Sequence, residues 1–314
     1  RIAVAGLGTD TGGSTRVPAA LCGIAGLRPS VGNGGAERRY HDENAVVPIS
    51  HTRDTVGPMG RGVADLAWLD AAITGTTVPA AASLAGLRLG IPASFWAGLD
   101  SSLAPVVQAA RARLQAAGVV LVDVDLPGLA DLNNQVSFQI ALHEPIADLP
   151  AWLAANGAAN ISLADVAAGV ASPDVKGAFG AILADAFGAA YADAINVYRP
   201  RMQAVYAACF ANHRIEALLF PTTLLPATTI DAVNGSSTVS VNGGPAADTF
   251  GTYIRNTDPG SNAGLPGLSL PAGLTAEGLP VGLELDGPVG SDRRLIAIGL
   301  AMEALLGPVA APPL

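Results

Sequence analysis

The sequence predicts an α/β protein in which a mixed β-sheet is flanked by helices on both faces. Short apolar runs of strand length alternate with longer stretches whose apolar residues repeat at the helical period. Two such runs, 87–91 and 119–124, enclose a helical stretch, as the strands of a βαβ unit do. Because strand and helix alternate to the end of the chain, we expect residues 1–314 to form one domain with helices on both faces of its sheet.

Turn and capping residues separate the elements in the first half of the chain. The glycine-rich run 8–14 is expected to turn the chain between a buried strand at 2–7 and a helix at 17–21. Ser101 or Ser102 is expected to cap the helix inside the βαβ unit, because a hydroxyl there accepts from the free amides of the first turn. The apolar face of that helix consists of Leu103, Val106, Val107, Ala110 and Leu114.

The second half of the chain starts with an alanine-rich region, 135–212, which we expect to form a helical insertion. Its longest helical pattern covers 178–212. Further apolar runs predict three strands, at 217–221, 267–271 and 281–285. Ser291 and Asp292 are expected to cap the last helix. Its apolar face consists of Leu295, Ile298, Met302 and Leu305.

The charge balance argues against several classes of partner. The chain has 17 Lys and Arg against 26 Asp and Glu, a net charge of −9, whereas nucleic acids and anionic membranes favour basic surfaces. No apolar run reaches the roughly 18 residues of a membrane-spanning helix, and the N-terminal residues show no signal-peptide pattern. We therefore expect a cytoplasmic protein that binds neither nucleic acid nor membranes. Cys22 and Cys209 lack metal or redox spacing and are expected to be free, buried thiols.

The glycine-rich run 8–14 allows three interpretations. A phosphate-binding loop needs Gly-x-Gly-x-x-Gly before a helix or a terminal Gly-Lys-Ser/Thr, and the spacing here fits neither. A structural turn would use the glycines only for their freedom to adopt positive φ. A nucleophile loop would expose the Ser14 hydroxyl to substrate, while consecutive backbone N–H groups form an oxyanion hole that glycine leaves open.

A family resemblance favours the nucleophile loop. The segment 8–30, GTDTGGSTRVPAALCGIAGLRPS, resembles the core signature of the amidase signature family. Other segments resemble that family in the same order, at 50–59, 63–65, 262–266 and 278–283. The resemblance covers nearly the whole chain and implies the amidase signature fold with its N-terminal part absent. Within the family, Tyr40 and residues 47–55 are most similar to indoleacetamide and mandelamide hydrolases, which cleave primary amides of arylacetic-type acids.

The resemblance also implies a mechanism. Ser14 would attack an amide carbonyl and form an acyl-enzyme, with release of ammonia, and water would then hydrolyse the ester. The backbone N–H groups of Thr11, Gly12 and Gly13, together with that of Ser14, would stabilise the oxyanion.

Charged residues flank this loop and are expected to support it. We expect Asp10 and Arg16 to form an ion pair or a hydrogen-bond network. Arg53 and Asp54 either support the same loop or form a capped turn before the glycine and proline that follow them.

Two further parts of the family's catalytic machinery, a lysine base and a serine in a cis peptide, lie upstream of the nucleophile loop. Only thirteen residues precede Ser14, so we expect neither part within residues 1–314, and no activity from these residues alone. Lys176 is the only lysine, in a segment (172–177) expected to be a polar turn ahead of a helix, and nothing there resembles the family's lysine motif. We expect it to be a solvated surface residue.

Two rival functions stay open at this level. A Ser-His-Asp triad would need a Gly-x-Ser-x-Gly turn, which is absent, together with one of the four histidines, His41, His51, His143 and His213. A catalytically incomplete binding or assembly protein, resembling the amidotransferase A subunit, would lack turnover of an arylacetamide. We expect no cofactor and no metal, because no histidine has a second ligand at suitable spacing.

The expected partner is a small-molecule amide, and a homodimer is left open. Pocket residues are expected within 135–152 and 252–262. Among the aromatic residues, Trp68 belongs to an apolar helical face and is therefore expected in the core. Three others could line either the core or the pocket, namely Trp96, Phe138 and Trp152.

Overall fold

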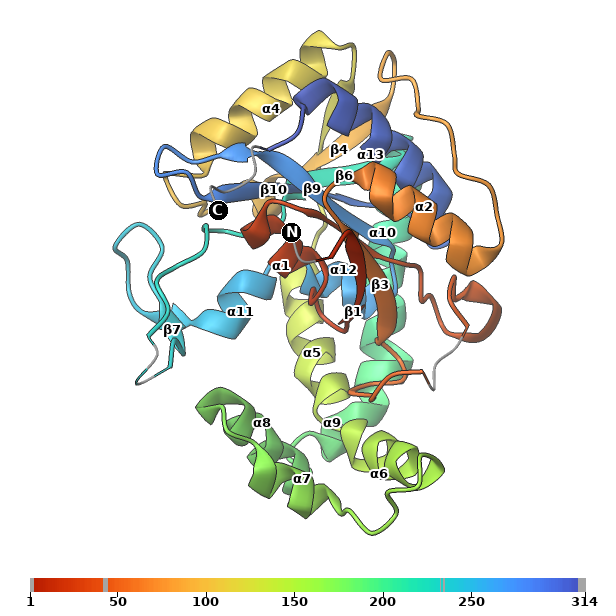
Figure 1. The fold of residues 1–314 in the computed structure, drawn as a ribbon, viewed down its shortest axis with the longest axis vertical. Coiled ribbons are helices and arrows are strands. Elements are labelled where there is room, and N and C mark those ends of the chain that lie inside the picture. The colour runs from red at the N-terminus through yellow and green to blue at the C-terminus, as the bar shows by residue number, and fades with distance from the viewer. Residues whose placement is uncertain (1–2, 42–44, 232, 234, 310–314) are drawn as a thin grey trace.

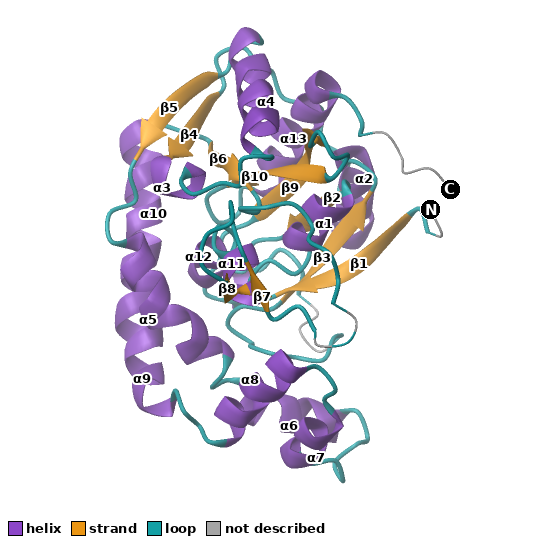
Figure 2. Ribbon diagram, turned by 90° about the vertical axis from the view of Figure 1, so that its left-hand side faces the viewer, coloured by secondary structure: helices purple, strands orange, loops and turns teal. Residues whose placement is uncertain are grey.

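A computed structural model describes residues 3–41, 45–231, 233 and 235–309. These residues build one eight-stranded sheet in the order β1-β3-β2-β9-β10-β6-β4-β5, and a separate two-stranded ribbon of β7 and β8 (Figure 2). The strands of the sheet are β1 (Ala5–Asp10), β2 (Ala25–Arg28), β3 (Thr55–Gly60), β4 (Arg88–Pro92), β5 (Val120–Val124), β6 (Ala217–Pro221), β9 (Gly267–Leu274) and β10 (Pro280–Asp286). The ribbon pairs β7 (Thr238–Val239) with β8 (Ala247–Asp248).

The sheet is mixed, because β4 runs parallel to β5 and β6 while the other neighbours pair antiparallel. The parallel pair β4 and β5 encloses a helix, which confirms the expected βαβ unit. The helices are α1 (Arg16–Cys22), α2 (Val63–Thr74), α3 (Ala93–Trp96), α4 (Ala104–Ala116), α5 (Leu129–Ala141), α6 (Pro145–Ala155), α7 (Leu163–Gly169), α8 (Pro173–Leu183), α9 (Gly188–Asp193), α10 (Arg199–His213), α11 (Thr249–Ile254), α12 (Asp258–Ala263) and α13 (Asp292–Leu306). The chain also forms a 3₁₀ helix at Gly35–Glu37 and a π-helix at Ala194–Tyr198.

Helices cover both faces of the sheet, as the sequence predicts (Figure 1). The apolar residues of α2, α4 and α13 pack on one face, and those of α5 and α10 pack on the other. β6 shows why its sequence is apolar throughout: Leu219 belongs to the first core, whereas Leu218 and Phe220 belong to the second. Helix α1 packs on the second face against β10. The two elements are so close that a Cβ added on Gly282 of β10 would lie 2.5 Å from the Cβ of Ala20 in α1.

Several local expectations are wrong in detail. The first strand covers Ala5–Asp10 at the edge of the sheet and is exposed or half-buried up to residue 9, so the expectation of a buried strand at 2–7 is wrong and the glycine-rich turn is shorter than residues 8–14 suggest. Residue 2 lies outside the described residues. Neither serine caps α4, because Leu103 occupies the N-cap and the Ser102 hydroxyl instead donates to Asp100. Ser291 stands at the N-cap of α13 but forms no side-chain capping hydrogen bond.

The helical region also differs from its pattern. The stretch 178–212 is not continuous, because α8 ends near Asp185, whose φ of 46° is left-handed. Trp68 is 70% exposed, since α2 turns other residues toward the core. Cys22 is exposed, and only Cys209 is buried; its thiol has its pKa raised by burial to about 11. Neither cysteine forms a disulfide.

Among the described residues, no single helix has both the length and the apolar character needed to cross a membrane. Two consecutive helical segments, Pro173–Leu183 and Gly188–His213, reach that length and apolar character only when they are taken together, and a bend of 83° separates them.

Candidate active site

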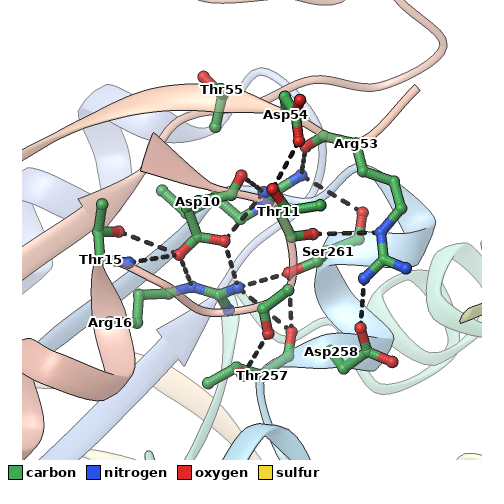
Figure 3. A network of polar contacts seen from close by, with 12 residues as sticks. Asp10, Thr11, Thr15, Arg16, Arg53, Asp54, Thr55, Thr257, Asp258 and Ser261 are labelled. Atoms are coloured by element: carbon green, nitrogen blue, oxygen red, sulfur yellow. Dashed lines mark hydrogen bonds and ion pairs between the residues drawn. The ribbon is translucent and has the colours of Figure 1, made fainter. Parts of the chain in front are cut away.

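The candidate site is the loop between β1 and α1, which comprises residues 11–15 (Figure 3). The loop lies where the end of β1 meets the N-terminus of α12, far along the chain. Ser14 is exposed, whereas Gly12 and Gly13 are buried. Gly13 has a φ of 138°, and a Cβ added there would lie 2.2 Å from Thr257 Oγ1. The position therefore requires glycine, both for its backbone conformation and for the close approach of Thr257.

Four successive backbone carbonyls, that of Asp10 at the end of β1 and those of residues 11–13 in the loop, each accept a hydrogen bond from outside the loop. The donors are Arg28 Nη1 to Asp10 O (2.6 Å), Arg53 Nε to Thr11 O (3.2 Å), Thr257 Oγ1 to Gly12 O (2.6 Å) and Val17 N to Gly13 O (2.8 Å). The described chain contains no cis peptide, so each N–H points away from the carbonyl of its own peptide plane. Within the described residues, the four N–H groups from Thr11 to Ser14 donate to no protein acceptor.

This arrangement fixes four peptide planes and leaves their N–H groups unpaired. Unpaired buried N–H groups are costly unless something else accepts their hydrogen bonds. Preorganised donors of this kind stabilise negative charge that develops on a carbonyl oxygen during acyl transfer. The loop therefore holds four unpaired N–H groups next to the exposed residue Ser14, and an oxyanion hole requires donors of this kind.

Asp10 is the anion around which the loop is organised. Its carboxylate accepts from the backbone N–H and hydroxyl of Thr15, at 3.2 and 3.0 Å. It also forms ion pairs with Arg16, at 3.1 Å, and with Arg28, at 3.0 Å. Burial opposes ionisation, but the two guanidinium groups hold the pKa of the Asp10 carboxyl well below its ordinary value. Asp10 is therefore charged throughout the physiological range.

Arg16 links the loop to the distant strand β10. Its guanidinium donates to Glu284, at 2.5 Å, and to the hydroxyl of Ser261, at 2.5 Å, in addition to Asp10. All of these groups are buried. Burial raises the pKa of Glu284 well above its ordinary value and that of Asp286 to about 6, although Arg16 opposes both shifts.

The segment around Arg53 and Asp54 supports the loop from the other side. Arg53 donates to the Thr11 carbonyl and forms a buried ion pair with Asp258. The Asp54 carboxylate accepts from the Thr11 hydroxyl at 2.5 Å and from two backbone N–H groups. Burial raises the pKa of Asp54, while these three hydrogen bonds oppose the rise. Of the two readings of this segment, support of the loop is the one its contacts favour.

A cleft of ≈ 730 Å³ lies near the loop, although none of residues 11–15 lines it. A Cβ added on Gly12 would lie 3.0 Å from Asp258 and 3.9 Å from Ile254, and both residues line the cleft. The other wall comes from α5 and includes Phe138. The two segments expected to hold pocket residues, 135–152 and 252–262, therefore meet at one cleft.

A smaller hollow of ≈ 240 Å³ lies beside Asp54 and is lined by Tyr40 and Trp152. Trp96 lines neither hollow, because its indole N–H donates to the Leu219 carbonyl at 2.9 Å and the ring packs against the core.

No histidine hydrogen-bonds Ser14 among the described residues, which argues against a Ser-His-Asp triad. His51 Nδ1 instead contacts Asp148 at 2.9 Å, and its Nε2 lies 3.4 Å from Glu144. Ligand atoms of these three residues lie within 4.8 Å of one another, close enough for a metal ion. Both Glu144 oxygens, however, already accept hydrogen bonds that hold the segment before Arg53.

The single lysine is not part of this site. Lys176 is exposed in α8, which lies at the end of the molecule opposite α4 (Figure 1). The helix begins at Pro173, so the expected polar turn at 172–177 is already helical. The expected solvated position of the lysine is confirmed.

The sequence patterns missed three supporting residues, Arg28, Thr257 and Ser261. Arg28 gave a signal that could have been used, because a charged residue inside a short apolar strand segment needs a buried partner. Thr257 contacts Gly12 and Ser261 contacts Arg16, each across 245 positions, and a single sequence does not show such contacts.

These features agree with the family to which the chain belongs. The family model named Amidase matches residues 1–296, and the chain is a member of that family. Among curated proteins, it is 42% identical over 311 residues to an indoleacetamide hydrolase of Agrobacterium vitis, covering 96% of this chain and 63% of that protein. It is 39% identical over 321 residues to a mandelamide hydrolase of Pseudomonas putida, covering 96% of this chain and 59% of that protein. The family resemblance seen in the sequence is confirmed.

Solved structures agree with this family. A crystal structure of an amidase has a TM-score of 0.75 and 27% identity, covering 96% of this chain and 63% of that one. The native peptide amidase of Stenotrophomonas maltophilia has a TM-score of 0.68 and 27% identity, covering 97% and 63%. The glutamyl-tRNA(Gln) amidotransferase of Thermotoga maritima shares the fold in its A subunit, at 22% identity and a TM-score of 0.68 over 96% and 62%. The chain spans about three fifths of the length of the relatives it matches.

Proposed function

We propose that the protein containing this chain hydrolyses the C–N bond of a small carboxylic amide through an acyl-enzyme on Ser14. The observation that supports this best is the Ser14 loop: an exposed hydroxyl stands beside four backbone N–H groups whose peptide planes are fixed and whose hydrogen bonds are unused. Membership of the amidase family supports the same reaction class.

In the proposed reaction, Ser14 Oγ bonds to the amide carbon and its proton passes to a base, while the carbonyl π electrons move to oxygen. The loop N–H groups bind that oxyanion. The intermediate then collapses, the C–N bond breaks with proton transfer to nitrogen, and ammonia leaves. Water repeats the addition on the ester and releases the carboxylic acid. No described titratable group hydrogen-bonds Ser14, and the family resemblance assigns the proton transfers to a lysine and a cis-peptide serine upstream of the loop.

We propose an arylacetamide-type primary amide as the substrate. The relatives named for such amides, the indoleacetamide and mandelamide hydrolases, are similar over 96% of the chain. The cleft beside Gly12 supports this class, because Phe138 and Ile254 give it apolar walls of a kind that accommodates an aryl group. The carboxylate of Asp258, which also lines the cleft, forms a buried ion pair with Arg53.

Release of ammonia from phenylacetamide tests the proposal. The assay uses the longest natural chain that contains residues 1–314. We expect turnover, and we expect Ser14→Ala to reduce kcat at least about 1,000-fold, because removal of a nucleophile in an acyl-transfer enzyme costs that much or more. Ser83→Ala is the matched control, since Ser83 is an exposed serine of another loop.

Unchanged turnover in Ser14→Ala would refute the nucleophile assignment. A wild-type protein that binds phenylacetamide but releases no ammonia would instead favour a non-catalytic role in binding or assembly.

A further inference from the structure

We propose that Thr257 is a positioning residue for the oxyanion hole. Its hydroxyl holds the Gly12 carbonyl and thereby orients the Gly13 N–H toward the reacting carbonyl oxygen. This inference rests on the proposed acyl transfer at Ser14 and adds to it a residue from the N-terminus of α12, which lies outside the loop and outside every sequence motif that the loop belongs to.

The hydrogen bond from Thr257 is short and buried. Thr257 Oγ1 lies 2.6 Å from the Gly12 carbonyl oxygen and 3.2 Å from the Ile254 carbonyl oxygen. A hydroxyl has one proton, and the shorter contact has the better length for an O–H donor, so Gly12 receives it. Thr257 is fully buried, and water does not compete for this hydrogen bond.

The peptide that Thr257 holds is the one most able to rotate. It joins Gly12 to Gly13, and two glycines without Cβ atoms leave the peptide plane free to flip. In a trans peptide, the Gly12 C=O and the Gly13 N–H point in opposite directions, so fixing the first orients the second. Of the contacts to this peptide among the described residues, Thr257 supplies the one hydrogen bond to its oxygen.

Thr257 is itself held in place. Its own carbonyl accepts from Arg16 Nη2 at 3.3 Å and from Ser261 Oγ at 3.0 Å. The next residue, Asp258, binds Arg53, which donates to the Thr11 carbonyl (Figure 3). One rigid turn therefore sets two successive peptides of the loop, the first through Arg53 and the second directly.

The test separates positioning from a merely structural role. Thr257→Val replaces the hydroxyl by a methyl group of similar size, Thr257→Ala leaves a smaller side chain, and Thr257→Ser retains the hydroxyl. Each variant, in the longest natural chain that contains residues 1–314, is assayed with phenylacetamide. Its affinity for benzyl trifluoromethyl ketone, which forms a tetrahedral oxyanion adduct with an active serine, is compared with that for phenylacetate.

We expect Thr257→Val to lower kcat about 10- to 100-fold, less than the 10²–10³ typical of deleting a donor, because the N–H is misaligned rather than removed. KM and the affinity for phenylacetate should change less than about threefold, since the Gly13 N–H that Thr257 orients binds the oxyanion rather than the ground-state ligand. Affinity for the ketone should fall by the same factor as kcat. Thr257→Ser should recover to within about threefold of wild type.

Thr74→Val is the matched control, because Thr74 Oγ1 donates to the Asp70 carbonyl at 2.7 Å in α2, on the opposite face of the sheet. Wild-type kcat in Thr257→Val would overturn the proposal. So would an equal loss for ketone and phenylacetate, or no rescue by serine, because either shows a structural role.

If Thr257→Val fails to fold, the comparison of Thr257→Ala with Thr257→Ser decides, since these two differ only by the hydroxyl. Failure of the proposed function is recognised separately: wild type then releases no ammonia, or Ser14→Ala matches wild type.

Discussion

Asp10 shows at the scale of one residue how the loop depends on buried charge. Its carboxylate compensates both Arg16 and Arg28, and all three side chains are fully buried. A buried ion pair adds little stability over an apolar pair of the same shape, but removing one partner leaves the other charge without compensation. Asp10 therefore keeps two guanidinium groups in place under the nucleophile loop.

We expect Asp10→Asn to lower the free energy of unfolding by about 3–5 kcal/mol, the usual result of breaking a buried ion pair. Urea denaturation at pH 7 measures this. Asp123→Asn is the control, because the Asp123 side chain is 91% exposed and its ion pair with Arg111 is long, at 3.8 Å; such a pair contributes at most about 1 kcal/mol. Equal effects of the two variants would contradict the account of Asp10.

The sequence predicted the local contacts of this site but not its long-range ones. Asp10 and Arg16 were expected to interact because they flank a short turn, and the structure contains that ion pair. Glu284 completes the environment of Arg16 from β10, 268 positions away. Local spacing does not specify contacts over that separation, because they depend on how strands are ordered in the sheet.

At the scale of elements, β3 lies between β1 and β2 and brings the Arg53 segment to the loop. Its position depends on Gly57, where an added Cβ would lie 2.2 Å from the Leu27 carbonyl oxygen and 2.8 Å from the Thr15 methyl group. Backbone cannot yield as a flexible side chain does, so this contact requires glycine.

We expect Gly57→Ala to cost about 1–3 kcal/mol of stability, as overpacking of a buried position does. Gly6→Ala in the neighbouring strand β1 is the matched control, because no atom of the described residues, chain neighbours aside, lies within 4 Å of a Cβ built there. Thermal unfolding of both variants measures the difference. If Gly57→Ala and Gly6→Ala unfold at the same temperature, Gly57 does not need to be glycine for β3 to pack against Leu27 and Thr15.

Elements with a simple apolar pattern were predictable, and those with mixed patterns were not. β6 was recognised because both of its faces are buried, which makes the sequence apolar throughout. Trp68 was assigned to the core because it is apolar, but the buried face of α2 includes Val63, Leu66 and Ala67, and Trp68 points away from it. The break after α8 depends on the left-handed Asp185, whose contact with His143 is tertiary.

For the whole molecule, the buried network under the loop has more acids than bases. It joins four carboxyl groups to three guanidinium groups. The members are Asp10, Asp258, Glu284 and Asp286 with Arg16, Arg28 and Arg53. Glu284 Oε2 and both Asp286 oxygens have no hydrogen-bond partner among the described residues. Burial raises the pKa of both carboxyl groups of this pair.

This excess predicts a pH dependence of stability. Burial raises the pKa of Asp286 from 3.8 to about 6, so the folded state binds the proton more tightly than the unfolded state. The resulting stability is complete below pH 3.8 and is lost as the pH rises through about 6. We expect Asp286→Asn to remove this loss and to be more stable than wild type at pH 8, by about 1–3 kcal/mol.

Urea denaturation of both proteins from pH 4 to 8 checks the prediction. The pKa of His51 is also raised, by its hydrogen bond to Asp148, so wild type and variant share that contribution and their difference reports on the pair of Asp286 and Glu284. A difference between the two proteins that stays constant over this range would show that Asp286 does not titrate there.

Trapping the acyl-enzyme tests whether Ser14 is acylated. The longest natural chain that contains residues 1–314 is mixed with 4-nitrophenyl phenylacetate and quenched in acid during the first turnover, before water hydrolyses the ester, and its peptides are analysed by mass spectrometry. Ser14 Oγ should form the ester bond as 4-nitrophenolate leaves, so the account predicts a phenylacetyl group on the peptide with Ser14 and none in Ser14→Ala. A label on another residue, or turnover that persists in Ser14→Ala, would contradict it.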